Sequence, residues 1–190
     1  MPVWLQHQGL GFKGGTPICG DAFRRFLEVC WPDTDAFTLS SHAVLYNDSC
    51  ALKKALQPWL VSTVTTDVWF GYGPGSSELR VYRYRAAPEA MEALLSCCYD
   101  ILFRKAPPGR RANRTRLFRG ALEDLCLFSK GTLFLGSISH EGECFWYPLN
   151  EEMARFAAYS GCWSPCQWRD WRSRLELRSY DWNSCCGPEK

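Results

Sequence analysis

The chain has 190 residues, with 22 Lys and Arg against 20 Asp and Glu, a formal net charge of +2, 11 cysteines and 9 tryptophans. This length suits one domain, and a hydrophobic fraction of 46% is typical of a folded globular protein and excludes a wholly disordered one. No apolar run approaches the roughly 18 residues of a membrane span, and the near-neutral charge excludes a generally basic nucleic-acid coat.

The first predicted elements are a lead-in, a helix and a strand. Residues 1–16 are rich in glycine and predict an irregular lead-in. Apolar residues recur at helical spacing over 22–31, which predicts a helix with Asp21 as its N-cap and Pro32 at its end. Branched and aromatic residues dominate 36–46 and predict a β-strand there.

The middle of the chain predicts a hairpin followed by a helix. A short helix over 49–57 precedes a strand over 60–70, which the glycine-rich segment 71–77 interrupts. An alternating pattern over 79–84 then resumes β-structure, so we expect the two strands to pair as a hairpin. The clearest helical pattern covers 88–104, where a proline in the first turn precedes one continuous apolar stripe.

The last part of the chain predicts two strands and two helices. Residues 117–128 fit a helix or a strand equally well. Strands are expected over 132–139 and 144–149, joined by a polar turn that contains glycine. A helix is expected over 150–159, capped by the asparagine at its first position, and a further helix begins at Ser164.

Helices and strands do not alternate regularly, which predicts the α+β class. We expect a mainly antiparallel sheet with segregated helices in a single compact domain over 17–183, with a basic loop at 104–119 and a frayed C-terminus at 184–190. The first 15 residues lack the basic and apolar segments of a signal peptide. The 11 cysteines are therefore expected in a reducing compartment, the cytoplasm or the nucleus, most of them as core thiols.

Four residues have the donor types of a tetrahedral zinc site: His140, Cys144, Cys162 and Cys166. The first two flank the predicted polar turn. The last two bracket a predicted helix start, where the positive end of the helix dipole favours thiolate. The spacing is not that of a standard zinc finger, so two interpretations remain: one structural zinc ion, or no cofactor and ordinary thiols.

The charge distribution is most uneven at 104–119, which carries seven basic residues and no acidic one. These residues are Arg104, Lys105, Arg110, Arg111, Arg114, Arg116 and Arg119. Without them, 15 basic residues face 20 acidic ones, so the rest of the chain is net acidic. Such a basic loop can contact nucleic-acid phosphates, act as a nuclear-import signal or bind an acidic partner; the alternative is a solvated loop.

Five of the nine tryptophans lie in the last 45 residues. Among them, Trp168 and Trp171 alternate with Arg169 and Arg172. Core packing is the default interpretation of a tryptophan, but Trp and Arg together are typical of the residues that dominate binding energy at protein interfaces. The pattern therefore predicts a partner-binding surface on this segment.

Catalytic patterns are weaker. No cysteine lies in a cysteine-protease signature, and the chain has no Gly-x-Ser-x-Gly sequence. Only three histidines are present to activate a nucleophilic thiol. Of these, His42 lies in an apolar predicted strand and is interpreted as a hydrogen-bonded structural histidine.

Two pieces of the chain resemble the SUKH/US22-like domains, α+β modules of bacterial immunity proteins and of accessory proteins of large DNA viruses. One is the apolar-Cys-Cys segment 94–102, and the other is the helix that leads into Trp31-Pro32. The segments 131–136 and 145–149, which form most of a predicted strand pair, add to the likeness. The resemblance covers most of the chain and implies a non-enzymatic binding module that antagonises host defence. It supplies no catalytic residue.

These observations favour a non-enzymatic intracellular protein-interaction module, in the role of a viral accessory factor that binds a host or cellular protein. It would act through the Trp/Arg segment and the basic loop. One alternative is a zinc-stabilised nucleic-acid-binding or adaptor protein, with the basic loop on the nucleic acid. A thiol-dependent enzyme is the second alternative. The sequence leaves the oligomeric state open.

Overall fold

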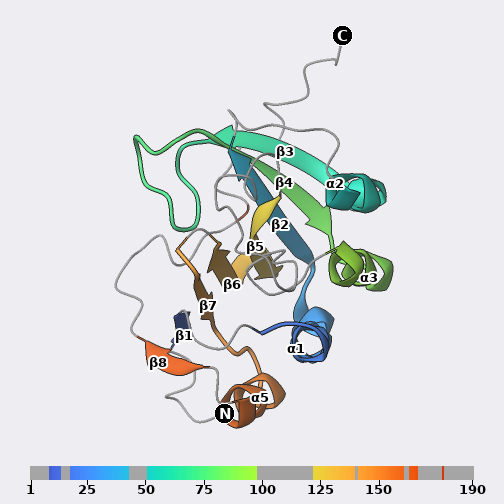
Figure 1. Ribbon diagram of the computed structural model, residues 1–190, viewed down its shortest axis with the longest axis vertical. Coiled ribbons are helices and arrows are strands. Elements are labelled where there is room, and N and C mark those ends of the chain that lie inside the picture. The colour runs from blue at the N-terminus through green and yellow to red at the C-terminus, as the bar shows by residue number, and fades with distance from the viewer. Residues whose placement is uncertain are drawn as a thin grey trace, which may run out of the picture.

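We describe the protein from a computed structural model, over residues 9–13, 18–42, 51–97, 122–139, 141–160, 163–166 and 177. These residues form one eight-stranded sheet with the strand order β3-β4-β2-β5-β6-β7-β1-β8. Every pair of neighbouring strands is antiparallel. The labelled helices lie together on one side of the sheet (Figure 1). The predicted α+β class, with an antiparallel sheet and segregated helices in a single compact fold, is confirmed.

The strands are β1 (Gly9–Lys13), β2 (Ala36–His42), β3 (Leu60–Thr66), β4 (Leu79–Arg85), β5 (Glu123–Ser129), β6 (Thr132–Ile138), β7 (Glu143–Trp146) and β8 (Ser164–Cys166). The α-helices of the described part are α1 (Asp21–Cys30), α2 (Ala51–Leu56), α3 (Pro88–Cys97) and α5 (Glu151–Ser160). Short 3-10 turns follow two of them, η2 (Trp31–Asp33) after α1 and η4 (Gln57–Trp59) after α2. No helix within these ranges is long and apolar enough to cross a membrane.

Most of the predicted elements are present. The predicted hairpin is confirmed, because β3 and β4 pair antiparallel. The ambiguous segment 117–128 contains the start of β5, so its described part is strand. The predicted cap of α5 is also confirmed, since the backbone N–H of Met153 donates to Oδ1 of Asn150 at 2.9 Å. The predicted helix over 88–104 agrees with α3 as far as Cys97, and 98–104 lie outside the described residues.

Four predictions about the elements are wrong. The expected irregular lead-in contains β1, and the helix expected from Ser164 is instead β8. Both strands are short and are defined by their pairing, since β1 lies between β7 and β8. The strand expected over 60–70 ends at Thr66. The N-cap of α1 is Gly20 rather than Asp21, which lies in the first turn, where its charge complements the helix dipole.

The helices cover one face of the sheet, which we call the helix-covered face. The predicted apolar stripe of α1 is confirmed here, because its four members are fully or almost fully buried: Phe23, Phe26, Leu27 and Cys30. Phe26 lies at the centre of an aromatic cluster with Trp146 of β7, Phe156 of α5 and Trp163. Its ring centroid lies 5.0 Å from Trp146 and 5.7 Å from Trp163. The cluster fixes α1 and α5 on the sheet.

The opposite face is covered by the connection between β3 and β4, residues 67–78, which we call the strap. It extends on the side of the sheet away from the helices (Figure 1). Trp69, Phe70 and Tyr72 of the strap are buried in a second apolar cluster, which also contains Cys126 and Phe128 of β5. The central strands β2, β5 and β6 are therefore buried on both faces, with the helices on one side and the strap, together with Leu177, on the other.

Two glycines allow the strap to approach the sheet closely. A Cβ atom on Gly136 of β6 would lie only 2.5 Å from a ring carbon of Phe70. Gly71 has φ +80°, and a Cβ there would lie 2.6 Å from Ile138. Glycine is needed at 136 because a side chain would have no space there. At 71 it is needed for space and also because the backbone has a positive φ.

We expect Phe26→Ala to lower the free energy of unfolding by about 3–5 kcal/mol, because it removes the ring that the aromatic cluster surrounds. Urea denaturation followed by circular dichroism measures this loss. Tyr159→Ala is the matched control, because Tyr159 is 88% exposed on α5 and its removal should change stability by about 0.5 kcal/mol or less. Equal effects of the two substitutions would contradict the assigned packing.

Candidate functional site

Most of the residues that the sequence predicts as binding sites lie outside the described residues. This holds for Trp168, Arg169, Trp171 and Arg172, and for the seven basic residues of 104–119. It also holds for His140 and Cys162 of the predicted zinc site. Those assignments therefore stay predictions. Of the predicted site residues, Cys144 on β7 and Cys166 on β8 are within the described part.

The backbone separates these two cysteine positions by a whole strand. Cys144 pairs with Phe12 of β1, and Cys166 pairs with Gly9 on the other edge of β1. Neighbouring strands lie about 4.8 Å apart and rise about 3.3 Å per residue, so the two positions are about 10 Å apart across the sheet and about 10 Å along it. A Zn–S bond is about 2.3 Å long. The structure thus does not bring the backbone positions of Cys144 and Cys166 together. In the described ranges no group of three potential metal ligands occurs.

The buried thiols of the described part are poor nucleophiles. Cys30, Cys126 and Cys144 are fully buried. Burial raises the pKa of each thiol above its ordinary value, and in Cys126 the nearby charge of Asp124 raises the pKa further. Since the thiolate is the reactive form, these three cysteines have the properties of core residues.

A buried polar cluster stands out on the strap-covered face, and it begins with an irregularity in β5. Thr38 of β2 pairs with Cys126, whereas Ser40 pairs with Glu123. An advance of two residues along β2 therefore matches an advance of three residues along β5. This β-bulge includes Asp124, whose φ is +56°. A positive φ is uncommon for residues other than glycine but is several-fold enriched for Asp. Bulges of this kind redirect side chains in a sheet.

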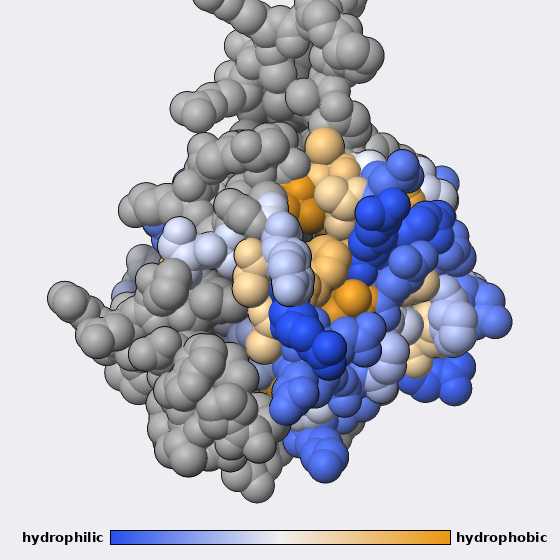
Figure 2. All heavy atoms as spheres, turned by 90° about the horizontal axis from the view of Figure 1, so that it is seen from below, coloured by the Kyte–Doolittle hydropathy of each residue, from blue (hydrophilic) through white to orange (hydrophobic). Residues whose placement is uncertain are grey.

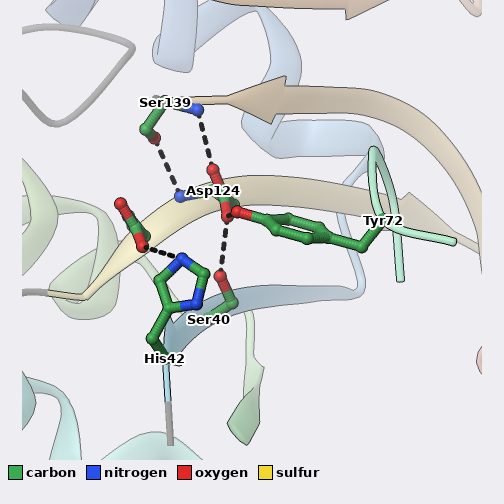
Figure 3. Close-up of polar contacts among 6 residues, drawn as sticks. Ser40, His42, Tyr72, Asp124 and Ser139 are labelled. Atoms are coloured by element: carbon green, nitrogen blue, oxygen red, sulfur yellow. Dashed lines mark hydrogen bonds and ion pairs between the residues drawn. The ribbon is translucent and has the colours of Figure 1, made fainter. Parts of the chain in front are cut away.

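The carboxylate of Asp124 is completely buried and accepts hydrogen bonds from three segments (Figure 3). Its Oδ2 accepts from the Ser40 hydroxyl of β2 at 2.8 Å and from the Tyr72 hydroxyl of the strap at 3.0 Å. Its Oδ1 accepts from the backbone N–H of Ser139 at 2.7 Å, and the Ser139 hydroxyl accepts from the backbone N–H of Asp124 at 3.0 Å. Three donors of this kind stabilise a buried charge that would otherwise be very unfavourable.

The neighbouring carboxyl group, that of Glu123, faces His42. Nε2 of His42 lies 3.4 Å from Oε1 of Glu123 (Figure 3). The Glu123 carboxyl is 8% exposed, and the His42 side chain is 27% exposed. Burial, together with the charge of Asp124, raises the pKa of Glu123 to about 8. Glu123 is therefore mainly protonated at neutral pH. Its contact with His42 is an ion pair only when the imidazole is protonated and the carboxyl group is ionised.

The cluster thus holds two adjacent carboxyl groups with different surroundings: Asp124 accepts three hydrogen bonds, whereas burial beside Asp124 raises the pKa of Glu123. Such a difference is typical of acid–base pairs in enzymes, and it also occurs in structural polar networks. Here the Asp124 carboxylate accepts hydrogen bonds from three protein donors. We therefore interpret the cluster as a structural tie between β2, β5, the strap and the end of β6. His42 lies in β2, and the interpretation of it as a hydrogen-bonded structural histidine stays a prediction.

Local sequence patterns do not predict this cluster. One available signal was the pair Glu123-Asp124 at the start of an otherwise apolar strand, Glu-Asp-Leu-Cys-Leu-Phe. Two consecutive acids in a strand normally point to opposite faces, so the pair would not be expected to meet one set of partners. Only the bulge lets Glu123 reach His42 while Asp124 reaches Ser40.

Exposed side chains with the chemistry of an interface lie on α5. Arg155 and Tyr159 are one helical turn apart, and both are largely exposed, with 71% of the Arg155 side chain accessible. Leu149, just before the helix, is also exposed. Figure 2 shows the end of the molecule where α5 lies in Figure 1, and hydrophobic residues there form a small area beside a hydrophilic surface.

Comparison with known proteins adds no relative. No protein-family model, no curated protein and no solved structure matches the chain. The resemblance to SUKH/US22-like domains therefore stays a prediction.

We expect Glu123→Gln to change the pH dependence of stability. Between about pH 4.5 and pH 8 the folded protein retains the Glu123 proton and the unfolded chain has lost it, so the free energy of unfolding falls as pH rises through this range. The glutamine variant lacks this loss. Its stability relative to the parent protein should therefore increase from about pH 5 to about pH 8 and then level off, measured by urea denaturation. A difference that does not vary with pH would refute the assigned burial of Glu123.

Zinc removal tests the predicted metal site. If His140, Cys144, Cys162 and Cys166 bind one zinc ion, protein purified without chelator should contain close to one equivalent of zinc, and a chelator should lower its melting temperature. Substitution of Cys162 by Ser should abolish the zinc content. Less than about half an equivalent of zinc would argue against the site.

Proposed function

We propose that this protein is a non-enzymatic binding module that acts by contact with another protein. The observation that carries the proposal is that three thiols and one carboxylate of the described residues are used internally. The three buried thiols have raised pKa values. The buried carboxylate of Asp124 is occupied by donors from Ser40, Tyr72 and Ser139. These contacts support a structural role for both groups.

The proposed binding surface is the Trp/Arg segment Trp168, Arg169, Trp171 and Arg172. Support comes from α5, the described helix that lies nearest before this segment in the sequence. Its exposed residues Arg155 and Tyr159 are of the same types, and Tyr, Trp and Arg are the residues most enriched among those that dominate interface energy. Five other tryptophans are already in the core or packed against buried residues: Trp31, Trp59, Trp69, Trp146 and Trp163.

The proposed partner is a host or cellular protein of the cytoplasm or nucleus. The sequence resemblance to SUKH/US22-like domains supports this, since it implies a module that antagonises host defence. The basic loop at 104–119 would add an electrostatic contact with an acidic surface of the partner. The role of a viral accessory factor rests on the same resemblance.

The test is affinity capture with the full chain, followed by mass spectrometry of the captured proteins. Substituting Trp168, Trp171 and Arg172 together by Ala should reduce capture of the specific partner at least about tenfold, because hot-spot residues each contribute about 2 kcal/mol or more. Val61→Ala is the control, since Val61 is an exposed apolar residue on β3, at the opposite edge of the sheet from β8.

The proposal requires the triple variant to keep the far-ultraviolet circular dichroism and the melting temperature of the parent protein. Unchanged capture by such a folded variant would refute the assigned surface. Capture that nuclease treatment abolishes would contradict a protein partner and favour the nucleic-acid alternative, in which binding weakens steeply as salt increases.

A further inference from the structure

The strap is attached to the sheet by apolar contacts and by the polar cluster. Trp69 and Phe70 are buried against the strap-covered face, with Phe70 lying directly over Gly136. Tyr72 donates its hydroxyl to the Asp124 carboxylate. The Tyr72 ring also meets the His42 ring edge-on, with centroids 5.9 Å apart. The attachment of the strap is therefore linked to the groups that surround Glu123.

The titratable groups around Glu123 come from β5, β2, the strap and the turn after β6, and among them the charge of Asp124 favours the neutral form of Glu123. Asp124 lies next to it on β5, and His42 faces it from β2. Tyr72 faces it from the strap, and Glu141 acts on the same tyrosine from the turn between β6 and β7. Cys126, two residues beyond Asp124, has a raised pKa and is a neutral thiol. Ionisation of Glu123 therefore adds a second negative charge beside Asp124 under the strap.

We propose that the strap is a pH-gated cover of the sheet, closed while Glu123 is protonated and released when Glu123 loses its proton. Release lets water reach both carboxylates, which lowers the unfavourable energy of holding two like charges in a buried place. The helix-covered face and the strand pairing stay as they are. The event is a local opening rather than global unfolding.

Opening would uncover Cys126. This thiol is fully buried, and Trp69 of the strap lies close enough to affect its pKa. Cys30 and Cys144 are equally buried, but they belong to the core cluster of the helix-covered face. The three cysteines therefore report separately on the two faces of the same sheet.

The test measures the rate at which a maleimide labels each cysteine in the folded protein, resolved by peptide mass spectrometry. Each rate is divided by that of the same cysteine in urea-unfolded protein at the same pH, which removes the effect of thiol ionisation. If Glu123 changes from a pKa of about 8 in the closed state to its ordinary value of 4.5 in the open state, the opening equilibrium should rise on the order of 100-fold from about pH 6 to about pH 9. The normalised rate of Cys126 should follow it, and those of Cys30 and Cys144 should not.

Three variants complete the test. Glu123→Gln should keep Cys126 protected at both pH values, because the side chain cannot ionise. Glu78→Gln, on an exposed carboxyl at the end of the strap, should retain the response of the parent protein. Tyr72→Phe should raise the labelling of Cys126 at both pH values, because it removes the hydrogen bond to Asp124.

Several outcomes would overturn the proposal. One is normalised labelling of Cys126 that does not change with pH. A second is a parallel rise for Cys30 and Cys144, which would show global unfolding. A third is an unchanged pH response in Glu123→Gln, which would assign the opening to another group.

Discussion

The hydrogen bonds to the carboxylate of Asp124 hold together parts of the chain that are far apart in sequence. Ser40, Tyr72 and Ser139 come from β2, the strap and the end of β6, and each donates to this one group. A carboxylate in so buried a place is tolerated only with such donors, so removal of any one of them leaves a charge that is incompletely compensated. The bulge at the start of β5 contains Asp124 and directs its side chain toward these donors. The bulge in β5 and the hydrogen bonds to the Asp124 carboxylate thus depend on each other.

The two faces of the sheet are buried by different means. On the helix-covered face, side chains of α1 and α5 meet Trp146 in an aromatic cluster, which is the usual way that helices cover a sheet. On the other face, the strap of twelve residues covers the sheet. It does so with three aromatic side chains and with close contacts at two glycines. Because the strap has no helical hydrogen bonds of its own to maintain, its attachment depends on those side chains and on the polar cluster. The difference explains why a local opening is expected on one face only.

The order of helices and strands could be predicted from local patterns, but the ends of the sheet could not. The apolar spacing of α1, the cap of α5 and the hairpin of β3 and β4 are local features, and they agree with the structure. The short strands β1 and β8 have no such pattern. They form because they pair with strands that are distant in sequence. The cluster around Asp124 could not be predicted for a related reason. It depends on a β-bulge, and the alternating pattern of a regular strand gives no sign of a bulge. The Trp/Arg segment and the basic loop remain sequence predictions.

The position of β1 has a consequence for how the chain acquires its structure during synthesis. This strand precedes all the other described elements in the sequence, yet its partners are β7 and β8, at 143–146 and 164–166. The strands between them can pair as soon as they emerge, whereas β1 must wait until β7 and β8 have left the ribosome. During that interval the outer edge of β7 lacks its partner and is open to pairing with other chains. Closing so large a loop is slow, so we expect insertion of β1 to be a late step of folding and the edge of β7 to be the place where a chaperone is most useful.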